Sequence, residues 1–252
     1  MRIELSPAFQ AAFPDGIFGA LVARNCPNRL EAERVHVDEG AAEARLRERF
    51  PGEAIVADPI ARAYAGYYHR HGGRYPVVHQ ARSILAGQRI GSASVLVEVL
   101  FTAELSSLVL TSGHDLHALA GPLLVDAARN GETFTRLSGK EQALKPGDMV
   151  VRDAEGVIAC VVHGPDFRTR LRAGSDAVLF GAWCPTGVPG AVVDVHLSTL
   201  AQLLLKEWPG ATVEAPRILS VQRAPLQEAP RTSEPWGIAV PPNGNERMGP
   251  EP

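Results

Sequence analysis

The second half of the sequence alternates short apolar runs with turn residues, a pattern that predicts β-strands. The runs are rich in branched residues and are bounded by Gly, Pro and Asp: GPLLVDAA, GETFTRLSG, EQALKPGDMVVRD, GVIACVVHG and DAVLFGAW. Short strands at such spacing are typical of antiparallel sheets. Gly131, Gly139 and Gly147 fall between runs, where tight turns need a left-handed backbone. We therefore expect a strand meander in this half.

Apolar residues at helical spacing predict helices before the strands and one after them. Ala42, Leu46 and Phe50, for example, are four residues apart. The helices are expected over residues 31–50, 58–72, 75–88 and 192–208, and a buried strand over 16–26. In residues 92–113 nearly every other residue or more is apolar, so their periodicity leaves open whether the middle forms a helix or a strand. Helices in one half and strands in the other indicate an α+β fold.

The composition changes at Pro209. Nine of the 20 prolines fall in the last 44 residues, and no apolar periodicity is found there. Such a segment cannot bury enough apolar surface to fold alone. The last helix begins at Asp194 or just before it, and we expect it to end the ordered domain, residues 1–208. Residues 209–252 are expected to form a Pro-rich, mostly disordered tail.

Composition and charge narrow the functional classes. With 252 residues and 45% hydrophobic content, the sequence can bury one sizeable core. A net charge of −3 argues against a protein whose whole surface binds polyanions, so any nucleic-acid contact must be local. Cys26, Cys160 and Cys184 have no paired spacing, which suits a reducing compartment. Without a signal-like segment or an apolar run near 18 residues, a cytoplasmic location away from membranes is expected.

Residues 114–159 read HDLHALAGPLLVDAARNGETFTRLSGKEQALKPGDMVVRDAEGVIA. In order and spacing, this stretch resembles the B3/B4 domain of the phenylalanyl-tRNA synthetase beta subunit, and more closely the free-standing proteins built from that domain. The shared positions are Asp115–Leu116, Gly121, Gly131–Glu132, Leu137, Gly139, Pro146–Gly147, Asp153 and Gly156–Val157. The helix at Tyr75–Pro76 is similar too. The resemblance implies a layered, β-sandwich-like core with flanking helices.

The resemblance also implies an activity. In the synthetase this domain hydrolyses tyrosine wrongly esterified to the tRNA for phenylalanine, and free-standing relatives are candidates for the same work in trans. An aminoacyl ester is already activated, so a pocket that positions the ester and a water can suffice. Ser112 stands where bacterial synthetases carry a histidine, and Phe180 where a glutamate reads the tyrosine hydroxyl. Because a phenyl ring accepts no such hydrogen bond, we expect a small or apolar amino acid rather than tyrosine.

Candidate catalytic residues flank the strand meander. Ser112, His114 and Asp115 form a polar cluster just after an apolar run, and His163 follows the meander on its other side. A cap or turn role is the alternative for Asp115. No third ligand pair at metal-binding spacing accompanies His114, Asp115 and His117, so neither a metal nor another cofactor is expected.

The candidate substrate-binding residues are Arg168, Thr169, Phe180 and His79. Arg168 and Thr169 match positions that carry Arg and Thr in free-standing members, and a guanidinium offers a fork of donors to phosphate or carboxylate. With Arg170 and Arg172 they form a dense basic cluster, which fits a contact with the tRNA 3′ end. A solvated hairpin tip is the alternative. His79 is expected to point into the pocket.

Three hypotheses follow. The first is a B3/B4-type protein that binds aminoacylated tRNA and hydrolyses a mischarged ester in trans. The second is a module that binds an amino-acid-like ligand or a tRNA end without chemistry. The third is a scaffold recruited for other chemistry on an aminoacyl substrate, through His114, Asp115 and His163. The sequence leaves open whether the protein is an enzyme, and it indicates no oligomeric state.

Overall fold

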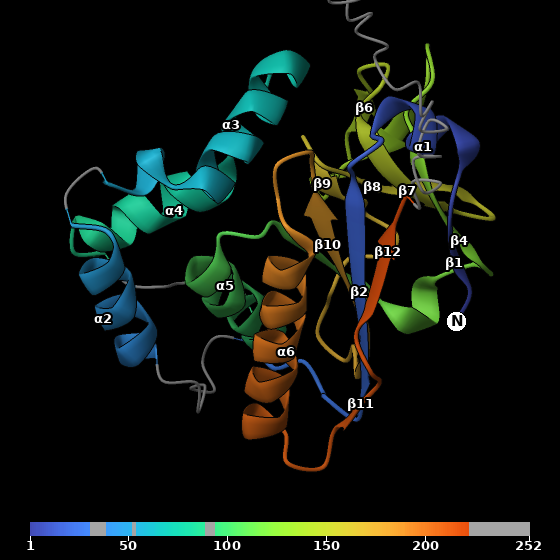
Figure 1. Ribbon diagram of the computed structural model, residues 1–252. Coiled ribbons are helices and arrows are strands. Elements are labelled where there is room, and N and C mark those ends of the chain that lie inside the picture. The colour runs from blue at the N-terminus through green and yellow to red at the C-terminus, as the bar shows by residue number, and fades with distance from the viewer. Residues whose placement is uncertain (31–38, 52–53, 89–93, 222–252) are drawn as a thin grey trace, which may run out of the picture. The chain divides into compact units, whose positions relative to one another are not determined.

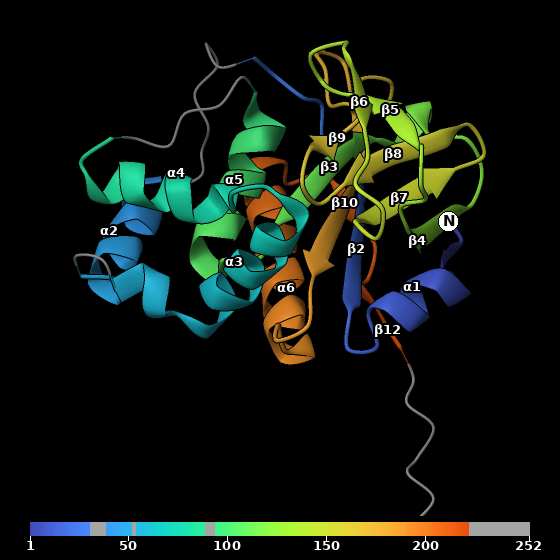
Figure 2. The same ribbon diagram turned by 90° about the horizontal axis from the view of Figure 1, so that it is seen from above.

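All helices except the short one at Pro7–Ala12 lie on one side of two stacked β-sheets (Figure 1). The computed structural model describes residues 1–30, 39–51, 54–88 and 94–221. Seen from above, the layers are helices, then a sheet containing β2 (Ile17–Arg24) and β10 (Ala177–Cys184), then a sheet containing β7 (Met149–Asp153) and β8 (Gly156–Cys160) (Figure 2). The predicted α+β fold, with layered sheets and flanking helices, is confirmed.

The central sheet is built on the antiparallel pair β2 and β10, which pair along their whole length. On the other side of β10 lies β3 (Thr111–Asp115), which forms one edge of this sheet. Every residue of β10 is buried, because helices cover one face of the sheet and the second sheet covers the other. A strand covered on both faces reads as a continuous apolar run, as the DAVLFGAW segment does.

The second sheet has the order β1-β4-β7-β8-β9, and a two-stranded ribbon adjoins it. Its other strands are β1 (Ile3–Leu5), β4 (Leu123–Ala127) and β9 (Gly164–Pro165). The ribbon consists of β5 (Thr133–Thr135) and β6 (Glu141–Ala143). Gly131, Gly139 and Gly147 have φ values of 75°, 76° and 82°. The predicted meander with left-handed glycine turns is therefore confirmed.

Each of the four predicted helices is found at its predicted place, as far as the prediction falls on described residues. The described helices are α1 (Pro7–Ala12), α2 (Glu39–Arg49), α3 (Pro59–His71), α4 (Pro76–Leu85), α5 (Val95–Ser107) and α6 (Gly190–Glu207), with short 3₁₀ turns η1 (Ala54–Ala57) and η2 (Leu116–Ala118). The helix α1 and the strand β1 were not predicted. The Asp58 side chain caps α3 by accepting the N–H of Ile60 at 2.8 Å. Residues 31–38, where the first helix was expected to begin, lie outside the described part.

Residues 92–113, which the sequence left open, form both kinds of element. The helix α5 runs to Ser107, Leu108 takes a left-handed conformation with φ 62°, and β3 follows. Nine of the 13 residues of α5 are buried, including Glu98 and Glu104. A helix buried on nearly all sides has no amphipathic stripe, which explains why its periodicity was not decisive.

Two strands follow the predicted domain end at residue 208. They are β11 (Thr212–Val213) and β12 (Arg217–Ser220), and both pair antiparallel with β2. The predicted boundary is therefore too early, because pairing with a long buried strand orders segments that have little apolar pattern of their own. The start of the last helix also differs from the prediction: α6 begins at Gly190, four residues before Asp194. Residues 222–252 lie outside the described part of the chain.

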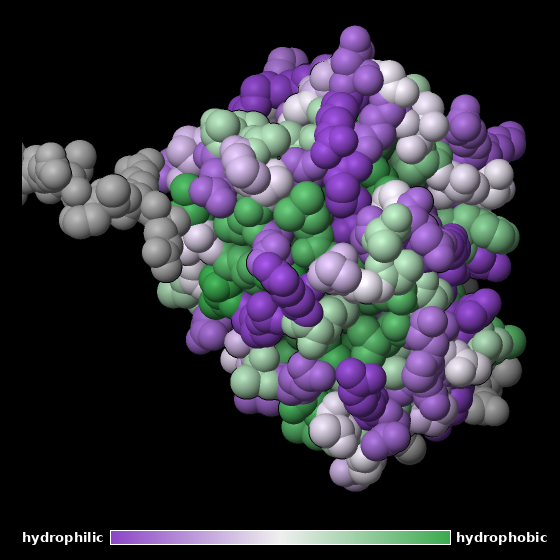
Figure 3. Space-filling model, turned by 90° about the vertical axis from the view of Figure 1, so that its right-hand side faces the viewer, coloured by the Kyte–Doolittle hydropathy of each residue, from purple (hydrophilic) through white to green (hydrophobic). Residues whose placement is uncertain are grey.

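On the side of the molecule where the second sheet lies, hydrophobic and hydrophilic residues are mixed at the surface (Figure 3). Within the described ranges, no helix combines the length and the apolar character needed to cross a membrane.

Candidate functional site

A pocket of about 650 Å³ lies beside the edge strand β3. Helix α5 provides one wall, and the segments after β8 and β9 provide another. Most of the lining is apolar: Tyr68, Pro76, Val97, Leu100, Phe101, Leu110, Val161, Val162, Leu171 and Trp183. The polar groups are fewer and include Thr111, Ser112, His163, Arg170 and Arg172. A largely apolar hollow of this size with a few polar groups is typical of small-molecule sites.

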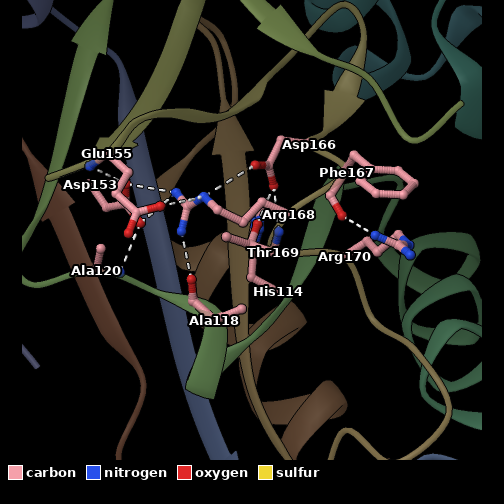
Figure 4. Close-up of polar contacts among 10 residues, drawn as sticks. All are labelled: His114, Ala118, Ala120, Asp153, Glu155, Asp166, Phe167, Arg168, Thr169 and Arg170. Atoms are coloured by element: carbon pink, nitrogen blue, oxygen red, sulfur yellow. Dashed lines mark hydrogen bonds and ion pairs between the residues drawn. The ribbon is translucent and has the colours of Figure 1, made fainter. Parts of the chain in front are cut away.

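Four side chains form a hydrogen-bonded series that starts on the pocket wall. Ser112 and His114 are two residues apart on β3 and therefore lie on the same face of the strand. The Ser112 Oγ is 3.0 Å from His114 Nε2, and His114 Nδ1 is 2.7 Å from Thr169 Oγ1. The Thr169 hydroxyl in turn donates to Asp166 (Figure 4). We call these four residues the Ser112 relay.

The partners fix where the protons of the relay lie. An ionised carboxylate only accepts hydrogen bonds, so Thr169 gives its proton to Asp166 and accepts from the Nδ1–H of His114. This leaves Nε2 of His114 as an acceptor, and the Ser112 hydroxyl donates to it. The indole N–H of Trp183 donates to Ser112 Oγ at 3.1 Å. A serine hydroxyl pointing at an imidazole lone pair is the arrangement used to activate an attacking oxygen.

Burial holds His114 in its neutral form. The residue is 2% exposed, and this burial lowers the pKa of its imidazole to about 4; Arg168 also lowers it, while Asp153 acts in the opposite direction. Thr169 and Ser112 are 0% and 4% exposed. A neutral imidazole with a fixed tautomer can accept a proton at neutral pH.

We expect His114 to remain neutral, with its proton on Nδ1, down to about pH 5. Between the ordinary pKa near 6.5 and the folded value of about 4, the unfolded chain takes up a proton that the folded one does not. The stability that His114 contributes is therefore present above pH 6.5 and is lost as the pH falls toward 4. NMR of ¹⁵N-labelled imidazoles reports both tautomer and titration. A His114 signal that is protonated on Nε2, or that titrates near pH 6.5, would contradict the relay.

The sequence range that holds the relay also matches a known family. Residues 80–201 match the B3/4 domain, and all four residues of the relay fall within them. This part of the chain is a B3/4 domain.

Two known proteins are similar to parts of this chain. The phenylalanine–tRNA ligase beta subunit of Anaeromyxobacter dehalogenans (strain 2CP-C) is 40% identical over 90 residues, which are 32% of this chain and 11% of that subunit. The chain thus matches about a tenth of the length of this relative. Among solved structures, an N-terminal fragment of the phenylalanyl-tRNA synthetase beta subunit from Pyrococcus horikoshii covers 84% of this chain and 50% of its own, with a TM-score of 0.44 and 13% identity.

Within the B3/4 domain, Asp115 serves as a cap beside the relay. Its carboxylate accepts the N–H of His117 at 3.0 Å and the hydroxyl of Ser175 at 2.8 Å, and it lies 3.4 Å from Arg172 Nε. It starts the turn η2 as its N-cap. The alternative weighed for Asp115, a cap or turn residue, fits these contacts better than the catalytic one.

His163 lines the pocket as predicted, but it is not part of the relay. Burial and Arg136 lower the pKa of its imidazole, and its ring lies 6.4 Å from that of Phe134. The neighbouring Cys160 also lines the pocket. Burial and the Asp148 carboxylate raise the pKa of the Cys160 thiol, so it stays protonated and unreactive at neutral pH.

The predicted basic cluster divides between two roles (Figure 4). Arg168 is held by Asp153, with Nη2 at 2.8 Å from both carboxylate oxygens, and donates to the carbonyl of Ala118 at 2.6 Å. It is not among the residues that line the pocket. Arg170 and Arg172 do line it, and the Arg170 guanidinium lies 3.6 Å from the ring centroid of Phe167. Of the basic cluster, Arg170 and Arg172 rather than Arg168 therefore face the pocket.

Two further predicted substrate-binding residues, Phe180 and His79, do not line the pocket. Phe180 is 0% exposed within β10 and is not a lining residue, although Trp183 on the same strand is. His79 lines a separate groove of about 420 Å³ between α3 and α4, together with His69 and Arg74. The pocket and this groove share Tyr68 as a common wall. Of the predicted site residues, the structure thus brings together Ser112, His114, His163 and Thr169.

The sequence missed several groups at the site. Asp166 ends the relay and Trp183 donates to Ser112, and neither was identified from the sequence. A second buried series joins Thr111 Oγ1 to His196 Nε2 at 2.7 Å and His196 Nδ1 to Ser107 Oγ at 2.8 Å. Burial lowers the pKa of His196 to about 4. Among the described residues, no group of three or more His, Cys, Asp or Glu side chains could hold a metal ion.

Proposed function

We propose that this B3/4 domain binds the aminoacylated 3′ end of a tRNA and hydrolyses the ester of a mischarged amino acid in trans. The observation that carries this proposal is the position of Ser112 on the wall of an apolar pocket, with its hydroxyl directed at neutral His114. Hydrolysis of an aminoacyl ester needs a base for the attacking oxygen and little further activation, since the ester is already reactive. The similarity to a tRNA ligase subunit supports the substrate class.

The lining favours an amino acid with an apolar side chain over tyrosine. No carboxylate occurs among the described residues that line the pocket, so a tyrosine hydroxyl finds no charged acceptor there. Leu100, Phe101 and Leu171 offer apolar surface instead. A site that gives a hydroxyl no strong partner cannot select for it. The argument for an apolar substrate thus rests on these side chains rather than on Phe180.

Basic groups near the pocket suit the phosphates of the tRNA end. Arg170 and Arg172 line the pocket, and Arg74 and His79 line the groove on the other side of Tyr68. Guanidinium groups bind phosphate oxygens through pairs of charge-assisted hydrogen bonds. Since the protein carries a net charge of −3, such attraction is confined to this region.

The test is a deacylation assay over tRNAs charged with different amino acids, with the full chain as the enzyme. We expect faster ester hydrolysis for at least one tRNA carrying a small or apolar amino acid, and less acceleration for tyrosine. Buffer alone and heat-denatured protein provide the background rate. No acceleration for any member of the panel would refute the enzymatic proposal.

A non-catalytic binding module is the second candidate, and the apolar volume of the pocket favours it. In that case free amino acids or amino-acid esters would raise the melting temperature further as their concentration rises above Kd, because a ligand that binds the folded state stabilises it. Stabilisation without ester cleavage would identify this candidate.

A further inference from the structure

We propose that Ser112 is a nucleophile that forms an acyl-serine intermediate, with the main-chain N–H of Gly113 stabilising the oxyanion. The inference rests on the proposed ester hydrolysis and specifies its mechanism. It also implies a further activity, the cleavage of simple amino-acid esters that carry no RNA.

The direction of the Gly113 N–H follows from the hydrogen-bond ladder of β3. The N–H groups of Thr111 and Asp115 point away from β10, since they donate to Glu104 Oε1 at 2.6 Å and to the Thr169 carbonyl at 2.7 Å. In contrast, the Leu110 carbonyl points toward β10, where it accepts the N–H of Trp183. Main-chain groups in a strand alternate in direction, so the N–H of Gly113 also points away from β10. Because Gly113 lines the pocket, this donor lies at its wall.

Close packing leaves little room for a side chain at Gly113. A Cβ atom there would lie 2.8 Å from Leu171 Cδ1 and 3.4 Å from the Phe180 ring. Leu171 is itself a lining residue, so it packs directly against this part of the strand. The backbone of Gly113 therefore reaches the pocket without a side chain of its own. Donation by the amide that follows the nucleophile is a recurrent design for stabilising the tetrahedral intermediate.

The steps balance with these groups alone. Ser112 Oγ attacks the ester carbonyl carbon while its proton passes to His114 Nε2, and the carbonyl oxygen becomes an oxyanion facing the Gly113 N–H. Thr169 and Asp166 stabilise the imidazolium through Nδ1–H. Collapse breaks the bond to the ribose oxygen, which leaves with the proton from Nε2. Water then attacks the acyl-serine, gives a proton to His114, and the amino acid departs as Ser112 recovers its proton.

The relay explains why Ser112, rather than another pocket hydroxyl, takes this role. Its oxygen accepts from Trp183 Nε1 at 3.1 Å, which holds it in place while its proton faces Nε2 of His114. The other acceptor within reach is the Gly181 carbonyl at 3.5 Å, a longer contact than the 3.0 Å to His114. One lone pair of Ser112 Oγ is left for attack.

The experiment is covalent labelling with a fluorophosphonate, followed by peptide mass spectrometry. We expect the wild-type protein to carry one phosphonyl group on Ser112, and the Ser112→Ala variant to lose it together with about 1000-fold or more of its rate toward a leucine p-nitrophenyl ester. Ser94→Ala is the matched control, because Ser94 lines the same pocket outside the relay, and it should keep the label. Site mapping on the wild type does not depend on how the variants fold.

The outcomes separate this inference from the proposed function. A wild-type protein that deacylates tRNA but carries no label on Ser112, or a Ser112→Ala variant of full rate, overturns the nucleophile and leaves the deacylase standing. Labelling of Ser112 with cleavage of the simple ester, but no effect on any charged tRNA, supports the nucleophile and refutes the tRNA substrate.

Discussion

Replacing Thr169 by valine is expected to slow ester hydrolysis by about two to three orders of magnitude, because the hydroxyl that fixes the tautomer of His114 is lost. Thr169 Oγ1 accepts from His114 Nδ1 at 2.7 Å and donates to Asp166. Without this hydroxyl, the tautomer of His114 that carries its proton on Nε2 becomes the more stable one, and that proton faces Ser112. The serine proton then has no acceptor, so attack is impaired while the apolar pocket still binds its substrate.

The conservative variant Thr169→Ser is the matched control, since it restores the hydroxyl at the same position. We expect it to regain most of the rate and the Nδ1–H signal in the ¹⁵N spectrum. The variants should differ in kcat far more than in KM, because the pocket lining is unchanged. Equal rates for the valine and serine variants would show that Thr169 only fills space.

Replacing Arg168 by alanine is expected to lower the free energy of unfolding by about 2–3 kcal/mol. Asp153, whose side chain is 0% exposed, would lose its cationic partner and remain as a buried carboxylate. Breaking a buried ion pair costs about 3–5 kcal/mol, and partial exposure of the arginine side chain reduces this through solvent screening. The carbonyl of Ala118 would lose its donor as well.

Arg170→Ala is the matched control for this variant, because Arg170 lines the pocket two residues away. Its loss should change the free energy of unfolding by less than about 0.5 kcal/mol and weaken substrate binding instead. Urea unfolding and steady-state kinetics measure the two effects separately. If Arg168→Ala kept full stability and raised KM as Arg170→Ala does, then Arg168 would contact substrate, as the sequence resemblance implied.

Local rules predicted much of the fold and part of the site. The polar cluster after an apolar run indicated Ser112 and His114 as candidates, and glycines between apolar runs indicated the turns of the meander. Such signals need only neighbouring residues. The partners Thr169 and Asp166 are more than 50 positions from His114 along the chain, and only tertiary pairing brings them to it.

The errors share one physical cause, which is that side-chain direction depends on what covers each element. Arg168 and Arg170 have the same chemistry, yet Arg168 is hydrogen-bonded to Asp153 and Arg170 lines the pocket. Phe180 is fully buried and does not line the pocket, whereas Trp183 on the same strand does. Residues 209–221 lack an apolar pattern, yet they are ordered by hydrogen bonds to β2.

The pairing of β11 and β12 with β2 also protects the protein against self-association. These two short strands occupy the side of β2 that β10 leaves open. The central sheet therefore ends at β3 on one side and at β11 and β12 on the other. An uncovered β2 would present eight residues of unpaired backbone, a template onto which a second molecule could add its own strand. A polypeptide shortened to residue 208 would carry that exposed edge, and oligomers would form through it.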